Sequence, residues 1–255
     1  MAASREISSV SDLIRAVPDI DHAHVRRWFR GHKRKGWCLL PRVYRGHFAK
    51  KSEEDRLRTE RFMMSDFRIL SSSIRRGSET DEEMYFIQQH YGMPTRLLDW
   101  TINPLAALFF AAEEEEKEED GELFMMDAWK FEPNAGRKAY GRDFSGIADA
   151  GHPVFRKALH RISQWSKDQF PDFIVPVRPH NFDVRINLQR SFFTFHVPGQ
   201  PKITEEINPS LTRFNIMKNT KAQIRKELDM LGIDPFRIYG DLENLAVTLC
   251  KTYDV

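Results

Sequence analysis

The stretch from Gly92 to Ala112 constrains the fold of this 255-residue chain more than any other. It begins with Gly-Met-Pro, which stops a helix expected over 81–91 and enforces an extended segment after it. Residues 96–100 are therefore expected to form a short strand or a buried extended turn. Residues 104–112 form an apolar run with proline in the first turn, which predicts a buried helix. A strand followed at once by an apolar helix indicates a core of mixed α and β structure.

Helices and strands are expected along the rest of the chain as well. Helices are indicated where apolar residues recur every three or four positions, and strands where β-branched and aromatic residues alternate. No internal repeat and no Pro/Gly/Ser-rich linker interrupts the sequence, so we predict one α+β domain. The other expected elements are a short capped helix that Pro18 stops, helices at 53–76 and about 154–165, strands at 24–31, 121–127, 173–177 and 191–197, and a helical tail over 203–255.

Apolar stripes are predicted on the longer helices. The segment 53–76 places apolar residues near a helical period, with dense charge between them. The tail carries two further stripes. The residues concerned are Leu57, Phe62, Met63, Phe67 and Leu70 in the first helix, Ile224, Leu228 and Leu231 on one stripe of the tail, and Leu242, Leu245, Val247 and Leu249 on the other.

Charge is unevenly distributed along the chain. Residues 1–76 carry 18 Lys and Arg against 9 Asp and Glu, whereas residues 77–135 carry 3 against 15. The basic first third could meet an anionic partner such as RNA, DNA or a nucleotide phosphate. Its arginines could equally line solvated helix faces and pair with acids elsewhere. The acidic run 113–120 is interpreted as a solvated helix end or loop, with an acidic decoy for a basic partner as the alternative.

Several classes of protein are excluded by what the sequence lacks. A run of about 18 apolar residues, which a membrane-spanning helix needs, is missing, and so is an apolar secretory signal. Cys38 and Cys250 are too few and too far apart for a disulfide framework or a zinc site, so we expect a cytoplasmic protein. His22 and His24 lack a third metal ligand, and Cys38 is interpreted as a core residue. The common phosphate-loop, dinucleotide, nucleophile-elbow and zinc-protease motifs are absent.

Two dense polar segments remain as candidates for function. In Trp-Phe-Arg-Gly, Arg30 is expected at the end of a strand that Gly31 terminates, where a backbone can approach a ligand and a guanidinium can hold an anion. Residues 89–104 surround two leucines with many hydrogen-bonding groups, whose burial is costly unless they satisfy each other or a ligand. A structural network, with Arg96 paired to Asp99 or Asp127, could also account for them.

These segments carry a family resemblance. Three segments resemble the FRG domain family, which is named after the Phe-Arg-Gly triplet. They are Trp-Phe-Arg-Gly at 28–31, Leu-Pro-Arg-Val-Tyr-Arg at 40–45 and the block 89–111. Residues 185–196 are similar to the family's Arg-Ile-x-x-Gln-x-x-x-Phe-Thr-x-His segment, and 231–243 resemble its C-terminal end.

The resemblance spans about 24–245 and implies the organisation of the domain. Residues 1–23 are expected to be an N-terminal helical extension, 24–205 the core, and 206–255 a helical C-terminal part of the same domain. Residues 131–170 look like an insertion into the core.

A looser resemblance concerns the activity. The order of four segments is similar to the core of ADP-ribosyltransferases. These segments are an Arg-Gly strand end, a Thr-x-x-x-Asp-Trp-Thr strand before an Ala-rich helix, an acidic loop and a further strand. This implies a split mixed or antiparallel sheet with surrounding helices, NAD as the substrate and no metal. Those enzymes carry a catalytic Glu near a late strand that leads to a Pro-Gly turn. Here Gln189 stands in about that position, and an amide cannot offer a full negative charge.

The resemblance implies roles for named residues. Arg30 would bind the NAD phosphates, with Arg96 as an alternative. Asp99 would supply negative charge to an oxocarbenium-like state if Gln189 only positions the ribose, or Asp99 would pair with Arg96 and cap a turn. Thr95 and Thr101 would order the ribose strand, and Tyr91, Trp100 or Phe193 would form a wall for the nicotinamide. The expected catalytic residues are Arg30, Asp99 and Gln189. The expected NAD-binding residues are Arg30, His90, Tyr91, Thr95, Arg96, Trp100, Thr101 and Phe193.

The partners are expectations of the same kind. A nucleic-acid acceptor, RNA rather than DNA, fits the aromatic residues interleaved with the basic ones, and a protein acceptor is permitted. A toxin of a bacterial defence or toxin–antitoxin system would also need a neutralising antitoxin. The alternative is a non-catalytic FRG module that binds a nucleotide or RNA, which the missing Glu favours. A nuclease is less favoured, since no metal cluster or Ser/Cys–His arrangement is visible. The aromatic residues are Trp28, Phe29, Trp37 and Tyr44.

Overall fold

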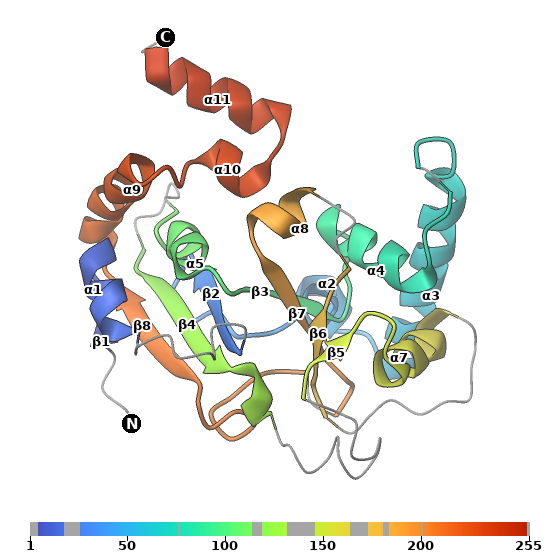
Figure 1. Ribbon diagram of the computed structural model, residues 1–255. Coiled ribbons are helices and arrows are strands. Elements are labelled where there is room, and N and C mark those ends of the chain that lie inside the picture. Colours follow the sequence, from blue (N-terminus) through green and yellow to red (C-terminus); the bar gives the residue numbers. More distant parts are fainter. Residues whose placement is uncertain are drawn as a thin grey trace.

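A single mixed sheet organises the molecule (Figure 1). The computed structural model describes residues 5–17, 26–75, 77–113, 119–131, 146–163, 173–180, 184–199 and 201–253. In these ranges eight strands lie in the order β1-β8-β4-β2-β3-β7-β6-β5, and only the edge pairs β1–β8 and β5–β6 are parallel. The strands are β1 Arg5–Glu6, β2 Arg27–His32, β3 Leu97–Thr101, β4 Gly121–Asp127, β5 Ala148–Asp149, β6 Val175–Arg178, β7 Ser191–Phe195 and β8 Thr212–Ile216.

Helices surround this sheet, which confirms the predicted α+β class. The α-helices are α1 Val10–Ala16, α2 Gly46–Ala49, α3 Glu53–Leu70, α4 Asp81–His90, α5 Pro104–Ala111, α7 Pro153–Ser163, α8 Val184–Leu188, α9 Lys221–Met230, α10 Pro235–Tyr239 and α11 Leu242–Tyr253. Short 3-10 turns are η1 Arg42–Tyr44, η2 Ala128–Lys130 and η3 Lys218–Thr220. None of the described helices combines the length and the apolarity that crossing a bilayer requires.

The two halves of the sheet meet at one pair of residues. β2 pairs with β4, and β3 with β7, along their whole lengths, but β2 and β3 are joined only through Phe29 and Thr101. The expectation of a split sheet is therefore corrected to one sheet with a narrow junction, because this pair keeps the two halves connected. On either side of it the backbones of β2 and β3 have no ladder hydrogen bonds to each other.

Two helical groups cover the same face of the sheet, one on each half. Phe29 of β2 packs in a core with α1, α5 and α9, whereas Phe193 of β7 packs in a core with α4 and α7. Phe29 is in register with Thr101, and Phe193 with Asp99, so all four side chains start from one face. A third core, around Trp28 and neighbouring strand residues, fills the opposite face. The covered face consequently has a gap between the two helical groups, above the junction.

Gly31 lies inside β2 rather than at its end, so the expected termination there is wrong. A Cβ atom on Gly31 would lie 2.0 Å from the carbonyl oxygen of Ala107 and 2.6 Å from the backbone nitrogen of Ala111. The glycine therefore lets α5 pack directly on the strand. The strand continues through His32.

The C-terminal segment is less helical than expected. It contains β8, which lies inside the sheet between β1 and β4. The strand begins with Thr212 and the exposed Arg213 and includes the buried Asn215, so its local pattern is weakly apolar. Its stability comes from pairing with strands that are distant in sequence, which local patterns do not reveal.

The prediction of apolar stripes on the longer helices is also partly wrong. The buried residues of α3 are Arg56, Glu60, Arg61 and Met64, while Phe62 and Leu70 are exposed. The reason is electrostatic, because Glu60 of α3 faces the buried Arg96.

In the tail, the first stripe is confirmed at Ile224 and Leu228, but Leu231 is exposed. The second stripe does not join the core, because α11 has no buried residue and lies apart from the sheet (Figure 1). Leu242, Val247 and Leu249 are exposed, and Leu245 is half-buried. Residues 146–163 of the expected insertion contribute α7 to a core cluster, and the expected domain boundaries stay predictions.

Candidate functional site

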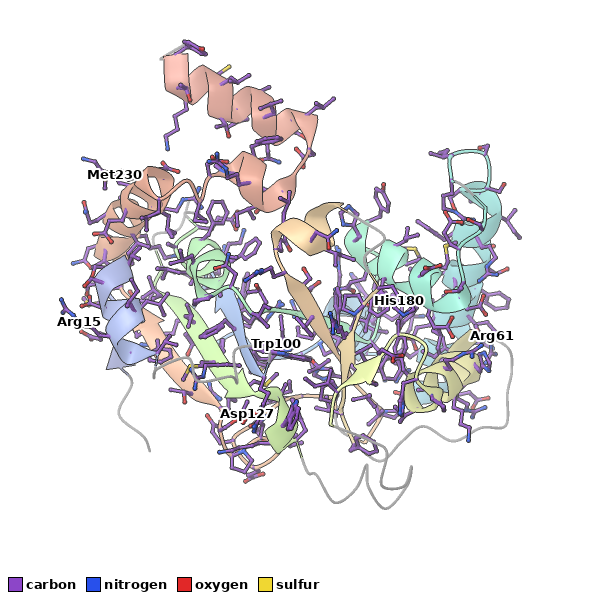
Figure 2. The ribbon with its side chains drawn as sticks, viewed as in Figure 1. Arg15, Arg61, Trp100, Asp127, His180 and Met230 are labelled. Atoms are coloured by element: carbon purple, nitrogen blue, oxygen red, sulfur yellow. The ribbon has the colours of Figure 1, made fainter. Side chains whose placement is uncertain are left out.

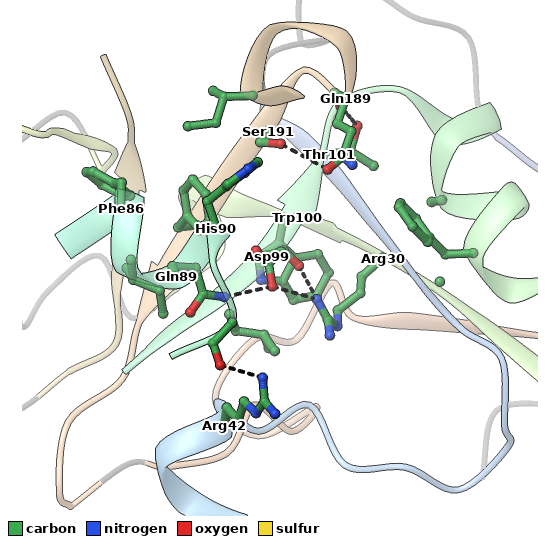
Figure 3. Close-up of a pocket in the computed structure, with 18 of the residues that line it drawn as sticks. Arg30, Arg42, Phe86, Gln89, His90, Asp99, Trp100, Thr101, Gln189 and Ser191 are labelled. Carbon is green, nitrogen blue, oxygen red and sulfur yellow. Dashed lines mark hydrogen bonds and ion pairs between the residues drawn. The ribbon is translucent and has the colours of Figure 1, made fainter. Parts of the chain in front are cut away.

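A cavity of about 380 Å³ occupies the gap between the two helical groups (Figure 3). Side chains from β2, β3 and β7 form its floor, and residues of α4, α5 and α8 form its walls. Residues 42 and 45, from η1 and the position after it, close one side. The cavity therefore lies where the sheet is joined by the single Phe29–Thr101 pair.

Arg30 fills the space in which β2 and β3 separate. Its Nη1 donates a hydrogen bond of 2.6 Å to the backbone carbonyl of Asp99 and lies 3.6 Å from the carboxylate of the same residue. Its Nε donates to Nε2 of His32 at 2.9 Å. Burial lowers the pKa of Arg30 to about 10, against the opposing effect of Asp99, so the guanidinium is charged at neutral pH.

Asp99 presents a carboxylate to the cavity. Its side chain is 52% exposed, and one carboxylate oxygen accepts a hydrogen bond of 2.9 Å from Nε2 of Gln89 (Figure 3). Gln89 is held in turn by the hydroxyl of Thr95, which donates to its side-chain carbonyl. Asp99 is consequently fixed between Arg30 and Gln89, and the suggested pair with Arg96 is wrong.

Two further arginines line the cavity. Arg42 donates to the backbone carbonyl of Gly92, and Arg45 donates through Nε and Nη2 to the carbonyl of Leu40. Burial and the neighbouring Arg42 lower the pKa of Arg45, while Asp99 raises it. Among the described residues that line the cavity, Asp99 is the only acidic one. Three guanidinium groups against one carboxylate give the cavity a positive potential that favours a polyanion.

Gln189 lines the cavity at the turn between α8 and β7. Its side-chain amide donates to the carbonyl of Ile238 in α10 at 3.0 Å, and its own backbone carbonyl accepts from the hydroxyl of Thr101. The following residue, Arg190, has φ of +48°, a left-handed conformation that is uncommon for a residue other than glycine. The turn is thus tied both to the junction strand and to α10.

The expected aromatic residues have different fates. Phe193 lines the cavity, and its ring centroid lies 5.0 Å from that of Phe86. Trp100, which Figure 2 labels in the middle of the molecule, also borders the cavity. Its side chain packs in the core on the opposite face, and its indole nitrogen donates to Thr194 at 3.0 Å. Tyr91 is exposed and does not line the cavity. Its neighbour His90, whose ring meets that of Tyr91 edge-on, does line it.

Arg96 and Thr95 do not reach the cavity. Nη2 of Arg96 lies 2.6 Å from carboxylate oxygens of both Glu53 and Glu60, and its Nη1 donates to Tyr44. Burial alone would lower the pKa of Arg96, but these neighbours raise it above its usual value. Arg96 is therefore a buried structural residue and is not available to bind a phosphate of a ligand in the cavity. The suggested partner Asp127 instead pairs with Arg26.

Other expectations are also corrected. Trp28, Phe29 and Tyr44 are buried and offer no face for a base, whereas Trp37 is 41% exposed. Cys38 is exposed and is not a core residue. The residues His22 and His24 lie outside the described part of the chain. Within that part, no group of three His, Cys, Asp or Glu side chains could hold a metal ion.

The structure brings Arg30, Asp99 and Gln189 together with His90, Thr101 and Phe193 around one cavity, and their roles stay predictions. The sequence reasoning missed Arg42, Arg45, Gln89 and Phe86, although the 40–45 and 89–111 blocks contain the first three. The position of these three residues within segments that resemble the FRG family was the feature of the sequence that could have identified them.

A family model for the FRG domain matches residues 25–120. Residues 25–120 form an FRG domain. The FRG domain contains Arg30, Arg42, Arg45, Gln89 and Asp99, and so supplies every charged side chain that lines the cavity. The opposite wall, with Gln189 and Phe193, comes from the chain after the matched range. No curated protein and no solved structure matches this chain significantly.

Proposed function

We propose that this FRG domain protein binds NAD in the cavity and transfers its ADP-ribose to an acceptor. The observation that carries the proposal is the pair formed by Arg30 and Asp99, in which a half-exposed carboxylate stands beside a guanidinium cluster. The arginines fit a pyrophosphate, which a forked guanidinium binds through two oxygens. Phe193 and Phe86 line the cavity but are buried in the core, so they would give the nicotinamide an apolar wall rather than an open stacking face.

Asp99 is the residue proposed to stabilise the transition state. The bond between C1′ of the ribose and the nicotinamide nitrogen breaks, and its electron pair leaves on nicotinamide. The ribose then carries oxocarbenium character, which a nearby carboxylate stabilises as in glycosidases. The acceptor's nucleophile forms the new bond to C1′ and releases its proton to solvent. Gln189 supports the turn, since its side-chain amide already donates to α10.

RNA is the proposed acceptor, with DNA or protein as other outcomes of the same assay. Such a transferase would act as a toxin of a bacterial defence or toxin–antitoxin system, which requires a neutralising partner. Exposed thiols at both cysteines fit a reducing compartment such as the cytoplasm.

Replacing Asp99 with Asn tests this proposal. The amide keeps the size of the side chain but removes its charge, so nicotinamide release from NAD should fall by about 10²–10³-fold. The matched control is Asp66→Asn, which changes an exposed acid of α3 outside the cavity. Equal release by Asp99→Asn and the wild type would contradict the proposed role.

The second candidate function is a module that binds a nucleotide without reacting. The observation that favours it is Gln189, an amide where the resembling enzymes carry a Glu. Calorimetry that detects NAD binding, with nicotinamide release at background, would decide for this function.

A further inference from the structure

Arg45 lines two cavities. A second cavity, of about 290 Å³, is lined by Trp37, Cys38, Leu40 and Arg45. The first cavity contains Asp99, and Arg45 is among its lining residues too. The Arg45 side chain therefore stands between an acid-bearing cavity and one with a tryptophan wall.

Hydrogen bonds fix the guanidinium of Arg45. Its Nε and Nη2 both donate to the carbonyl of Leu40, which is itself part of the second cavity. This arrangement orients the guanidinium plane and directs Nη1 away from that carbonyl. Nη1 takes no part in this contact with Leu40, so we expect it to donate to a phosphate bound between the two cavities.

Trp37 is an aromatic surface held in place before any ligand binds. Its side chain is 41% exposed, and the guanidinium of Arg34 lies 5.7 Å from the ring centroid. The ring of His32 meets it edge-on at 5.9 Å. These two contacts limit rotation of the indole, and an exposed indole gains free energy when a planar ring stacks on it.

The two cavities lie on either side of Arg45, and a dinucleotide is arranged in the same order, with a nucleoside on each side of its pyrophosphate. We infer that the second cavity binds the adenine end of NAD, with the base stacked on Trp37 and the pyrophosphate on Arg45. This inference rests on the proposed NAD chemistry of the first cavity. The ligand would then span both cavities, with its nicotinamide end beside Asp99.

The test compares two fragments of NAD by calorimetry with the full chain. ADP-ribose keeps the adenine and the pyrophosphate, whereas nicotinamide mononucleotide lacks the adenine. Trp37→Ala should weaken ADP-ribose binding by about 5- to 150-fold, the usual loss of one base–aromatic stack, and leave nicotinamide mononucleotide unchanged. Trp37→Phe should restore most of the affinity.

Trp129→Ala is the matched control. Trp129 is 43% exposed and also lies under an arginine, with Arg26 at 4.4 Å from its centroid, but it lines neither cavity. Its loss should change neither affinity. Thermal melting of each variant confirms that the fold is kept.

The outcomes separate this inference from the proposed function. Trp37-dependent binding of ADP-ribose without nicotinamide release would support the adenine site and contradict the transferase. NAD cleavage with a KM that Trp37→Ala leaves unchanged would overturn the adenine site and keep the transferase. If Trp37→Ala reduced only transfer to RNA, the cavity would belong to an acceptor base, which also overturns the inference. Failure of the wild type to bind ADP-ribose overturns it as well.

Discussion

At the scale of single residues, neutral side chains orient the charges of the cavity. His32 accepts a hydrogen bond from Arg30, and Gln89 donates one to Asp99. Neither of these two hydrogen bonds cancels a charge, because both partners are neutral. His32 must stay neutral to accept from Arg30, and its environment ensures this. Burial, followed by the charges of Arg30 and Arg45, lowers the pKa of His32 to about 2.

Buried neutral histidines make the stability depend on pH. Burial likewise lowers the pKa of His196 to about 3. In the unfolded chain both groups take up a proton below a pH of about 6.5, whereas in the folded protein they do not. Their contribution is therefore present above pH 6.5 and is lost as the pH falls from 6.5 towards 3.

His32→Gln should reduce this acid sensitivity. Glutamine keeps an oxygen that can accept from Arg30 but does not titrate. Between pH 7 and pH 5, the free energy of unfolding should fall by about 1–2 kcal/mol less in the variant than in the wild type. Urea unfolding at the two pH values measures the difference. An identical fall in both proteins would show that His32 is protonated in the folded state.

The polar block 89–104 shows what single residues reveal in sequence. Its density predicted groups that either pair with each other or face a ligand, and the structure shows buried paired groups as well as one carboxylate that faces the cavity. Asp99 faces the cavity, while Arg96 is buried against Glu60. Sequence could not separate these roles, because Glu60 lies 36 positions earlier and no local pattern links it to Arg96.

At the scale of elements, the close contact between β2 and α5 positions the cavity. Gly31 permits this contact, and Gly121 of β4 does the same, since a Cβ there would lie 2.1 Å from the carbonyl of Ala111. The position of α5 sets one wall of the cavity through Ala107 and Phe110. The strand–helix unit itself was predictable from sequence, whereas β8 was not, because non-local pairing determines it.

Gly31→Ala should consequently destabilise the protein. The new methyl group would collide with backbone atoms of α5, which cannot rotate away as a side chain can, at a cost of about 3 kcal/mol. Gly199→Ala is the matched control, because no atom lies within 4 Å of the Cβ position there. Chemical denaturation compares the two. Equal stability of both variants would contradict the packing role assigned to Gly31.

At the scale of the whole molecule, the charge asymmetry of the sequence is largely resolved by folding. Basic side chains of residues 1–76 pair with acidic side chains of residues 77–135. This favours the interpretation that these basic residues form ion pairs within the protein rather than contacts with an anionic partner. Among the described residues these pairs are Arg26–Asp127, Arg30–Asp99, Lys33–Glu113, Arg34–Glu119, Lys35–Asp120, Arg68–Asp81 and Arg75–Glu79. The arginines of the cavity are the part of this charge that is concentrated around a concave site.

Binding of RNA should therefore depend only modestly on salt. If two or three phosphates contact the cavity arginines, the slope of log affinity against log salt is about −1.4 to −2 for a single strand. A random-sequence oligonucleotide titrated at several salt concentrations measures this slope. A slope near −6 would instead require contacts by the whole basic third.

Nicotinamide release from NAD tests the central claim most directly. The wild type and Arg30→Ala are compared with total cellular RNA present and absent, and melting curves confirm that both are folded. We predict release by the wild type, a loss of about 10²-fold in Arg30→Ala, and faster release with RNA if RNA is the acceptor. No release by the wild type under either condition would contradict the claim and leave the cavity as a nucleotide-binding site.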